Sequence, residues 1–361
     1  MKIIKNIMSI SAAMALAAAM TSCSNANSDS EKQFERTAPD SVSFEWQKAY
    51  EDKLKEFKKS KDYSDDQESG SAFDLFDITG DGSPELIISP NTGGSTKCSV
   101  YSFSDGEASE IGSVGNTGCF MYLPLINTVK DEYCGDGFVI GKLFKYENGS
   151  FNQELSYSDN SQSVMSSDTS GTLIVHEING EEVLLPEYDK ALEPYEKSPA
   201  VKVGRKYSMG DGVIKYAVYR AESWGKIISP ADKKLCMDML KEKLLPEYES
   251  GSEITYELAD LNNDDVPELL VSAGTYPEAP CSIFYFKNNT LCPVDGTYGS
   301  WGEITLDTDN LIFYSVSGTE TIYWSIANSA FSSTSYVSSG NTAVLGRKRL
   351  LTEENLSADF S

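Results

Sequence analysis

The sequence predicts an α+β protein, mainly of antiparallel β-strands, built from two related units that each combine a helix with a β-meander. Three observations support this prediction. Short segments rich in Tyr, Phe, Ile and Val alternate with Gly, Asn and Asp, as in antiparallel sheets. Only two long segments have helical periodicity, whereas a parallel α/β sheet needs a helix after nearly every strand. An acidic segment, with the strands around it, occurs twice in the chain.

The acidic segment occupies residues 77–86 and again 260–269. Its first, third, fifth and ninth positions carry oxygen-bearing side chains, and its seventh position would add a backbone carbonyl. These positions are Asp77, Thr79, Asp81, Ser83 and Glu85 in the first copy and Asp260, Asn262, Asp264, Val266 and Glu268 in the second. Ca²⁺ prefers six to eight oxygens. An ordinary Asp-Gly turn does not need the ninth-position glutamate, so two copies that keep it predict two calcium sites.

The sixth position of the segment distinguishes the two copies. It is Gly82 in the first and Asp265 in the second. Asp tolerates the left-handed conformation better than most residues other than glycine. We therefore expect the second loop to be slightly strained or to bind calcium more weakly.

A predicted helix begins each unit. In the first unit it covers 41–60, with Asp40 or Ser41 as its cap and with Trp46, Tyr50, Leu54 and Phe57 on its apolar face. In the second it covers 229–248 and has Ser229 as N-cap, Pro230 at the first helical position and Asp232 in the first turn. Its buried face is predicted at Leu235 or Cys236, and at Leu240 and Leu244.

The predicted strands keep the same order in both copies. The first copy has strands at 72–76, 85–89, 98–103, 119–127, 138–146 and 150–157. The second has them at 254–259, 268–272, 281–286, 302–306, 311–316, 321–327 and 331–337. Each acidic loop therefore joins two strands. The first unit also contains an insertion near 158–203, in which 158–171 is a Ser/Asp-rich loop, 172–178 a strand and 186–197 a short helix.

The N-terminus predicts export. Residues 1–22 combine two early lysines with a short alanine-rich apolar run, as in a secretory leader. The following Met20-Thr21-Ser22-Cys23 resembles a bacterial lipobox, which implies that Cys23 is acylated and anchors the protein to the extracytoplasmic face of the membrane. The alternative is an ordinary secreted protein. Residues 23–40 are too polar to fold, so we expect them to form a flexible tether. Two repeat units are predicted after the tether, at 41–228 and 229–361.

Charge and cysteines limit the remaining possibilities. The formal net charge of −25 argues against nucleic-acid binding, which needs basic patches. Beyond Cys23 the chain has six cysteines and no C-x-x-C pair, so no zinc ribbon or thioredoxin-like site is expected. Cys98 and Cys281 occupy equivalent positions in the two copies, which favours buried apolar residues over disulfide partners.

The acidic loops resemble the calcium loops of FG-GAP/VCBS repeats, as in the β-propeller of integrin α chains. The resemblance covers ten to fifteen residues per copy and implies calcium at the positions named above. It implies no propeller, because the two loops stand 183 residues apart. An EF-hand is excluded, since it needs flanking helices and a twelfth-position carboxylate, whereas Ile88 and Val271 stand there. The whole arrangement also resembles surface lipoproteins of anaerobic Gram-positive bacteria.

No enzyme motif is complete in the chain. His176 is its only histidine, and we expect it to be a solvent-facing strand residue. G-x-S-x-G, P-loop and dinucleotide motifs are absent from the sequence. A glycosidase needs only two carboxylates, so a cell-wall or glycan hydrolase stays an alternative.

We therefore expect a non-enzymatic binding or structural module at the cell surface, with a glycan or a protein as its ligand. A solute-binding lipoprotein that serves a transporter is a further alternative. Sugar-stacking aromatics would come from Trp46, Trp224, Trp301 and Trp324, most of which we expect to pack between strands. Trp301, in a Gly-rich turn, is the best candidate for an exposed ring.

Overall fold

The computed structural model describes residues 44–360 except 67–68, 94–95, 136, 166–169, 222–227, 245–253, 263, 265, 275–278, 288–289, 295–297, 300, 318–319, 328–329, 334–337 and 347. The predicted leader, Cys23, the tether, the caps Asp40 and Ser41, and Trp224 lie outside this part of the chain. The described residues form two compact units. One comprises Lys48–Met209, and the other comprises Gly210–Ser361 together with the residues up to Gln47.

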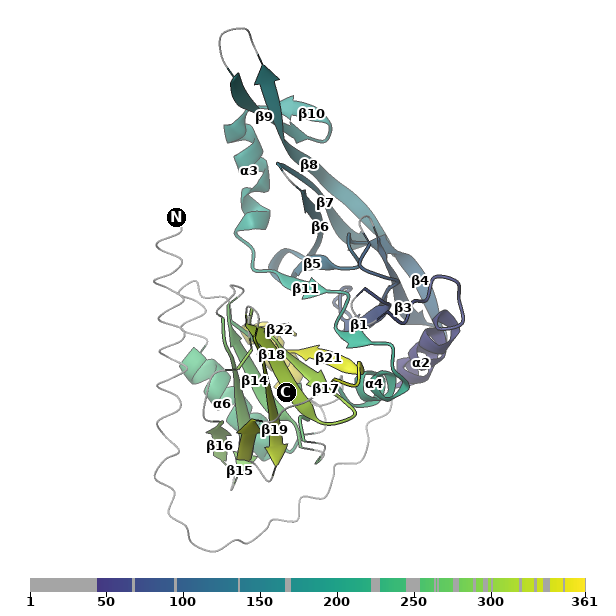
Figure 1. The fold of residues 1–361 in the computed structure, drawn as a ribbon, viewed down its shortest axis with the longest axis vertical. Coiled ribbons are helices and arrows are strands. Elements are labelled where there is room, and N and C mark those ends of the chain that lie inside the picture. The colour runs from purple at the N-terminus through teal and green to yellow at the C-terminus, as the bar shows by residue number, and fades with distance from the viewer. Residues whose placement is uncertain are drawn as a thin grey trace, which may run out of the picture. The chain divides into compact units, whose positions relative to one another are not determined.

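The unit Lys48–Met209 contains helix α2, two sets of strands and an inserted helix (Figure 1). One set has the order β12-β1-β2-β3-β4, and the other has the order β10-β9-β8-β7-β6-β5-β11. The bounds are α2 Glu45–Phe57, β1 Ala72–Phe76, β2 Glu85–Ser89, β3 Cys98–Ser104, β4 Glu107–Val114, β5 Phe120–Leu123, η2 Pro124–Ile126, β6 Thr128–Gly135, β7 Phe138–Glu147, β8 Ser150–Met165, β9 Ser170–Ile178, β10 Glu181–Val183, α3 Leu185–Glu196, β11 Val201–Val203 and β12 Tyr207–Ser208.

The other unit also contains two sets of strands, and their order resembles that of the first unit. One set of strands has the order β16-β15-β14-β13-β22, and the other has the order β20-β19-β18-β17-β21. The bounds are α4 Asp211–Tyr216, η3 Ala217–Ala221, α6 Pro230–Asp238, η4 Met239–Leu244, β13 Ile254–Ala259, β14 Glu268–Ala273, β15 Cys281–Lys287, β16 Thr290–Pro293, β17 Ile304–Asp307, β18 Ile312–Ser317, β19 Glu320–Ala327, β20 Ala330–Ser333, β21 Thr342–Leu345, β22 Arg349–Leu350 and α8 Glu353–Phe360.

The expected α+β class with mainly antiparallel strands is confirmed. In both units the strands pair antiparallel with their neighbours. The pairing register is also the same in both: Ala72 faces Ser89 across β1–β2, and Thr255 faces Ser272 across β13–β14. Equal registers agree with a duplicated unit. Common origin of the two copies, and the boundary between residues 228 and 229, stay predictions.

The core of the first unit lies between its two sets of strands. Buried side chains of β1–β4, such as Ile87 and Val100, pack in one cluster with Phe120 of β5 and Val203 of β11. Pleated strands alternate their side chains between two faces, so one face of each set can enter this layer. The arrangement fixes both ends of the β1–β2 hairpin, which carries the first acidic loop.

The two predicted long helices are present. In α2, Trp46, Tyr50 and Leu54 are buried, as expected from their spacing. In α6, the hydroxyl of Ser229 accepts a hydrogen bond from the backbone N–H of Asp232 at 3.1 Å, which confirms this residue as the N-cap. Cys236 is fully buried, and the helix continues as the π-helical turn η4. Cys236 and Leu240 pack in one buried cluster with Tyr256 of β13, the strand that leads into the second acidic loop.

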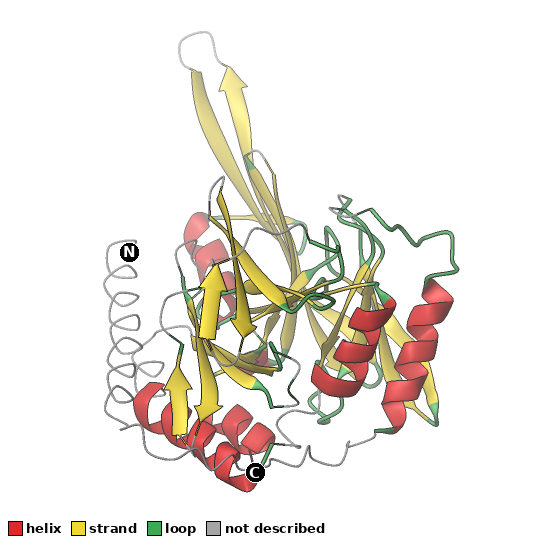
Figure 2. Cartoon of the chain, turned by 60° about the horizontal axis from the view of Figure 1, so that its bottom comes forward, coloured by secondary structure: helices red, strands yellow, loops and turns green. Residues whose placement is uncertain are grey.

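The inserted segment differs from its prediction. Residues 158–165 and 170–171 do not form an irregular loop, because β8 extends to Met165 and β9 begins at Ser170. The two strands make a long hairpin with α3 beside it (Figures 1 and 2). Residues 158–163 are all Ser, Asp, Asn or Gln, so they show no apolar alternation from which a strand could be predicted.

Several other boundaries were predicted wrongly. The strand expected at 119–127 ends at Leu123, because Pro124 starts a 3₁₀ turn and Asn127 takes a left-handed conformation with φ 47°. The sequence prediction also lacks several short elements, namely strands β4, β6, β10, β11, β12, β16, β21 and β22 and helices α4 and α8. Among the described residues, no helix has the length and apolar character needed to cross a membrane.

Candidate metal centre

Each acidic loop joins the two ends of a strand pair. Phe76, the last residue of β1, faces Glu85, the first residue of β2. In the second copy Ala259 of β13 faces Glu268 of β14. The ninth-position glutamate is therefore a strand residue held by the sheet, whereas the other predicted ligands lie on the loop. This agrees with the expected strand–turn–strand setting of both loops.

The aspartate carboxylates of the first loop accept hydrogen bonds from backbone N–H groups of the same loop. Asp77 Oδ1 accepts from the backbone N–H of Gly80 at 2.7 Å, and Asp77 Oδ2 accepts from that of Gly82 at 3.0 Å. Asp81 Oδ1 accepts from the N–H of Ser83 at 2.8 Å. Gly82 has φ +85°, a conformation that favours glycine. The tight curl thus depends on both the carboxylates and the glycine.

Glu85 is the buried member of the first loop. Its residue is 1% exposed, and Oε2 accepts from the backbone N–H of Ile78 at 2.8 Å and of Thr79 at 3.1 Å. Oε1 accepts from the Thr79 hydroxyl at 3.3 Å. Burial, together with the smaller effect of the negative charges of Asp77 and Asp81, raises the pKa of Glu85 to about 7, although the two N–H donors lower it. The loop therefore concentrates negative charge at a poorly solvated position.

The second loop repeats the pattern. Glu268 is 4% exposed, and its Oε2 accepts from the N–H of Leu261 at 2.8 Å, as Glu85 does from Ile78. Asp264 Oδ1 accepts from the N–H of Val266 at 2.9 Å. The pKa of Glu268 is raised well above its usual value, chiefly by burial and then by Asp260 and Asp264. The sixth-position Asp265 lies outside the described residues.

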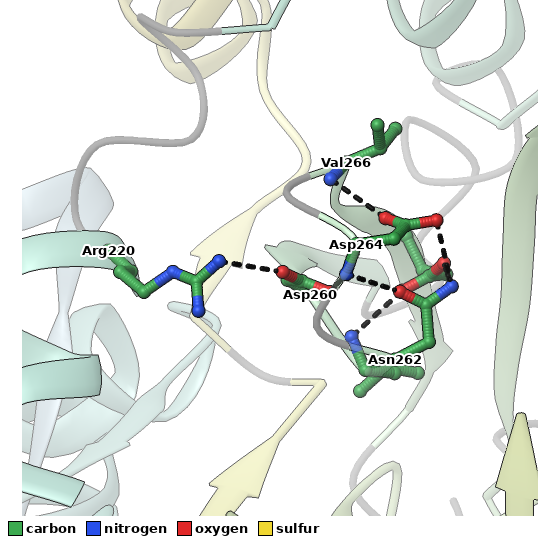
Figure 3. A network of polar contacts seen from close by, with 7 residues as sticks. Arg220, Asp260, Asn262, Asp264 and Val266 are labelled. Carbon is green, nitrogen blue, oxygen red and sulfur yellow. Dashed lines mark hydrogen bonds and ion pairs between the residues drawn. The ribbon is translucent and has the colours of Figure 1, made fainter. Parts of the chain in front are cut away.

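The second loop has in addition an arginine partner. Arg220 Nη2 lies 3.1 Å from Asp260 Oδ2 (Figure 3). The other oxygen, Asp260 Oδ1, accepts from the N–H of Asp264 at 3.2 Å. Asn262 donates from Nδ2 to Asp264 Oδ2 at 3.1 Å and accepts at Oδ1 from the Asp264 N–H at 3.0 Å. The first, third and fifth positions are thus in direct contact with one another.

Two tyrosines on helices contact or lie near the loops. Tyr50 of α2 donates to the carbonyl oxygen of Pro84, in the first loop, at 2.9 Å. Burial raises the pKa of Tyr50 well above its usual value, and Glu85 adds to this effect. Tyr216 of α4 has a buried hydroxyl that finds no hydrogen-bond partner among the described residues, and its pKa is raised by burial and by Glu257 and Asp260. The helices therefore bring hydroxyl groups close to both acidic regions.

The residues fit a hard cation in composition. Each loop supplies two aspartates and a buried glutamate together with a neutral oxygen, Thr79 Oγ1 or Asn262 Oδ1. A carboxylate that accepts one N–H keeps further lone pairs for a metal. Within the described ranges, however, no three or more His, Cys, Asp or Glu side chains already stand together as a metal-binding group. A cation would have to draw the carboxylates of each loop together.

Other predicted residues fall outside this centre. Cys98 and Cys281 are fully buried and carry free thiols, as expected. Trp46 is buried in the core, and Trp324 stacks on Phe313 at 5.7 Å between ring centroids. Trp301 is 49% exposed, in agreement with its expected position.

The prediction of a solvent-facing His176 was wrong. Its side chain is 12% exposed, and its ring lies 4.8 Å from that of Tyr188 on α3. Within the described part of the chain Nδ1 has no hydrogen-bond partner, and it lies 4.0 Å from Asp159 Oδ1. Helix α3 of the insertion covers this face of β9, which no local sequence pattern indicates.

Sequence reasoning missed Arg220 and Tyr50 as neighbours of the loops. Arg220 precedes Asp260 by 40 positions, and Tyr50 precedes Pro84 by 34. Neither distance corresponds to a local spacing rule, so only the fold brings these side chains to the loops. A helical apolar face was the sole signal for Tyr50, and it indicated burial rather than a loop contact.

Comparisons with known proteins add no identity. The chain matches no protein-family model, no curated protein and no solved structure.

Proposed function

We propose that the chain is an extracytoplasmic lipoprotein, anchored through Cys23, whose two acidic loops bind Ca²⁺ and stabilise a surface binding module. In the first loop, Asp77, Thr79, Asp81 and Glu85 would hold the ion through side-chain oxygens, with Ser83 adding its carbonyl. Asp260, Asn262, Asp264, Val266 and Glu268 would act in the same way in the second loop. The bound ion would neutralise carboxylates and pin the turn between two strands.

The single observation that carries this proposal is the buried Glu85. A carboxylate that is 1% exposed, with its pKa raised to about 7 by burial and by two neighbouring aspartates, disfavours its own ionised form. A divalent cation at this position would reverse the effect, since an opposite charge favours ionisation. The two backbone N–H groups that Glu85 accepts would hold the turn equally well with a neutral side chain, so the buried acid is better explained by a cation than by the turn alone.

Export supports calcium as the ion. Extracellular calcium sites work at concentrations of about 10⁻⁴–10⁻³ M, which suits loops that are partly exposed and only partly prearranged. The predicted leader and lipobox would deliver the chain to that environment. Both segments lie outside the described residues.

Thermal melts test the calcium proposal. Calcium at about 100 times its dissociation constant should add about 2.7 kcal/mol per occupied site. For units of this size we expect a rise of roughly 5–11 °C in melting temperature over the chelator-treated protein. Asp77→Asn and Asp260→Asn should remove the response of their own loops, whereas Asp105→Asn, in an exposed hairpin turn, should not. Identical melts with calcium and with chelator would rule the proposal out.

One observation favours a carbohydrate ligand for the module. Trp301 is 49% exposed and has φ +56°, an unusual conformation for a bulky residue. Thr117 has nearly the same φ, +54°, in the corresponding turn of the first unit, so this backbone does not require tryptophan. An exposed indole can stack on a sugar ring. Retention on an insoluble polysaccharide, lost in Trp301→Ala but kept in Leu125→Ala, would support this role; equal retention would exclude it.

A further inference from the structure

We infer that Arg220 is a built-in counter-ion of the second acidic loop, which competes with calcium for Asp260 and thereby sets the calcium affinity of that loop. The inference rests on the proposed function, because it concerns the same ion. It adds a residue that lies far from the loop in the chain and belongs to no part of the acidic motif. It also implies that calcium and the segment carrying Arg220 influence each other.

The geometry places the guanidinium on the first ligand of the loop. Arg220 Nη2 is 3.1 Å from Asp260 Oδ2, and the Asp260 side chain is only 1% exposed (Figure 3). Oδ1 of the same carboxylate accepts the N–H of Asp264 at 3.2 Å. Both oxygens of the buried carboxylate therefore have partners, and one of these partners carries a full positive charge. A calcium ion that uses Asp260 must share it with Arg220 or displace the arginine.

The segment that carries Arg220 is anchored rather than loose. Arg220 lies on the short helical stretch α4–η3, whose Val213, Ile214, Ala217 and Val218 are buried. This stretch belongs to the same compact unit as the second loop. The guanidinium is thus delivered at a fixed place. Its side chain is 30% exposed, so solvent reaches the arginine beside its contact with Asp260.

Electrostatics decide the direction of the effect. A guanidinium beside a ligand carboxylate repels an incoming divalent cation and already satisfies the carboxylate, and both effects lower calcium affinity. Binding linkage is reciprocal, so calcium must weaken the Arg220 contact by the same factor by which Arg220 weakens calcium. Removal of the charge at position 220 should therefore raise the calcium affinity of the second loop.

Calorimetric calcium titrations of the full chain test this. The Asp77→Asn background removes the first loop, so the remaining binding belongs to the second. In that background Arg220→Gln should bind calcium about tenfold or more tightly than the parent. Arg220→Lys keeps the charge and should stay within about twofold of the parent. Lys215→Gln, an exposed position on α4, makes the same charge change away from the loop and should have no effect.

The outcomes separate this inference from the proposed function. Suppose that the parent binds calcium and that Arg220→Gln leaves its affinity unchanged or lowers it. This result would overturn the role of Arg220 but leave the proposal of calcium-binding loops standing. No calcium binding in the wild type or any variant would overturn the proposed function, and the inference with it. If Arg220→Gln does not fold, Arg220→Lys decides: a tenfold gain with the charge retained would contradict competition by charge.

Discussion

Replacement of Glu85 by glutamine should change the stability of the protein in opposite directions with and without calcium. Gln keeps the shape and can accept the two backbone N–H groups at Oε1 while donating to Thr79 Oγ1, so the local contacts survive. What changes is the charge. In the calcium-free protein the substitution removes a buried carboxylate that is unfavourable when ionised. In the calcium-loaded protein it removes a ligand.

The magnitude follows from the pKa of Glu85. This pKa is raised from 4.5 to about 7 on folding, so the ionised carboxylate disfavours the folded state above that range. A shift of this size corresponds to about 3 kcal/mol at pH 8. The pKa of Glu85 is higher in the folded state than in the unfolded state, so ionisation of this carboxyl group opposes folding. The contribution of Glu85 to the stability of the calcium-free wild type is therefore most favourable below about pH 4.5 and is lost as the pH rises through 7.

Urea unfolding at two pH values measures the effect. At pH 8 in chelator, Glu85→Gln should be more stable than the wild type by up to about 3 kcal/mol, and near pH 4.5 by less than about 0.5 kcal/mol. In saturating calcium at pH 8 the order should reverse. Glu110→Gln, at an exposed position on β4, makes the same change in charge and should shift neither curve. A Glu85→Gln variant less stable than the wild type in chelator at pH 8 would refute the reasoning.

The remaining expectations concern the scaffold and the anchor. Ser229→Ala removes the N-cap of α6 and should cost about 1 kcal/mol in urea unfolding, with Ser229→Asp recovering most of it. Gly302→Ala should cost about 2 kcal/mol or more, because Gly302 has φ +73° and an added Cβ would lie 2.8 Å from the Gly274 carbonyl oxygen; calorimetry would measure this. Leu54→Ala, at a fully buried position, should cost about 2–5 kcal/mol, whereas exposed Leu184→Ala should cost little. Cys23→Ser should move the protein from the membrane fraction to the soluble fraction; unchanged partition would exclude the lipid anchor.

Strands could be predicted closely where turn chemistry marks their ends. The expected strands at 72–76, 85–89 and 254–259 agree with β1, β2 and β13 at both ends. Each adjoins the acidic segment, whose Asp, Gly and Pro residues cannot continue a strand. All three are buried along their whole length, so the apolar signal was strong as well.

Elements without an apolar pattern were missed. Only Val114 of strand β4 is buried, and the strand reads Glu-Ala-Ser-Glu-Ile-Gly-Ser-Val, so neither hydrophobicity nor alternation indicates it. Helix α4 contains Gly212 and β-branched residues, which have low helix propensity. Helix α8 follows Thr352, a residue type that often caps helices. In the structure Thr352 Oγ1 accepts a hydrogen bond from the N–H of Asn355 at 3.1 Å, as an N-cap does.

One part of the candidate site could likewise be predicted from the sequence, and another part could not. Its ligands were accessible from the sequence because alternate oxygens on one tight turn form a local pattern that occurs twice. The burial of Glu85 and the pairing of Arg220 with Asp260 were not accessible, because both come from elements distant in the chain. The spacing of residues along the chain can therefore predict a metal-binding loop, but the charges around that loop depend on tertiary packing.

Direct calcium binding to the chelator-treated wild type tests the central claim most directly. Equilibrium dialysis at pH 8 should find calcium bound at up to two ions per chain, falling by one in Asp77→Asn and reaching none in the Asp77→Asn, Asp260→Asn double variant. Retained binding in the double variant would place the ion elsewhere. No bound calcium in the wild type at millimolar concentration would contradict the account.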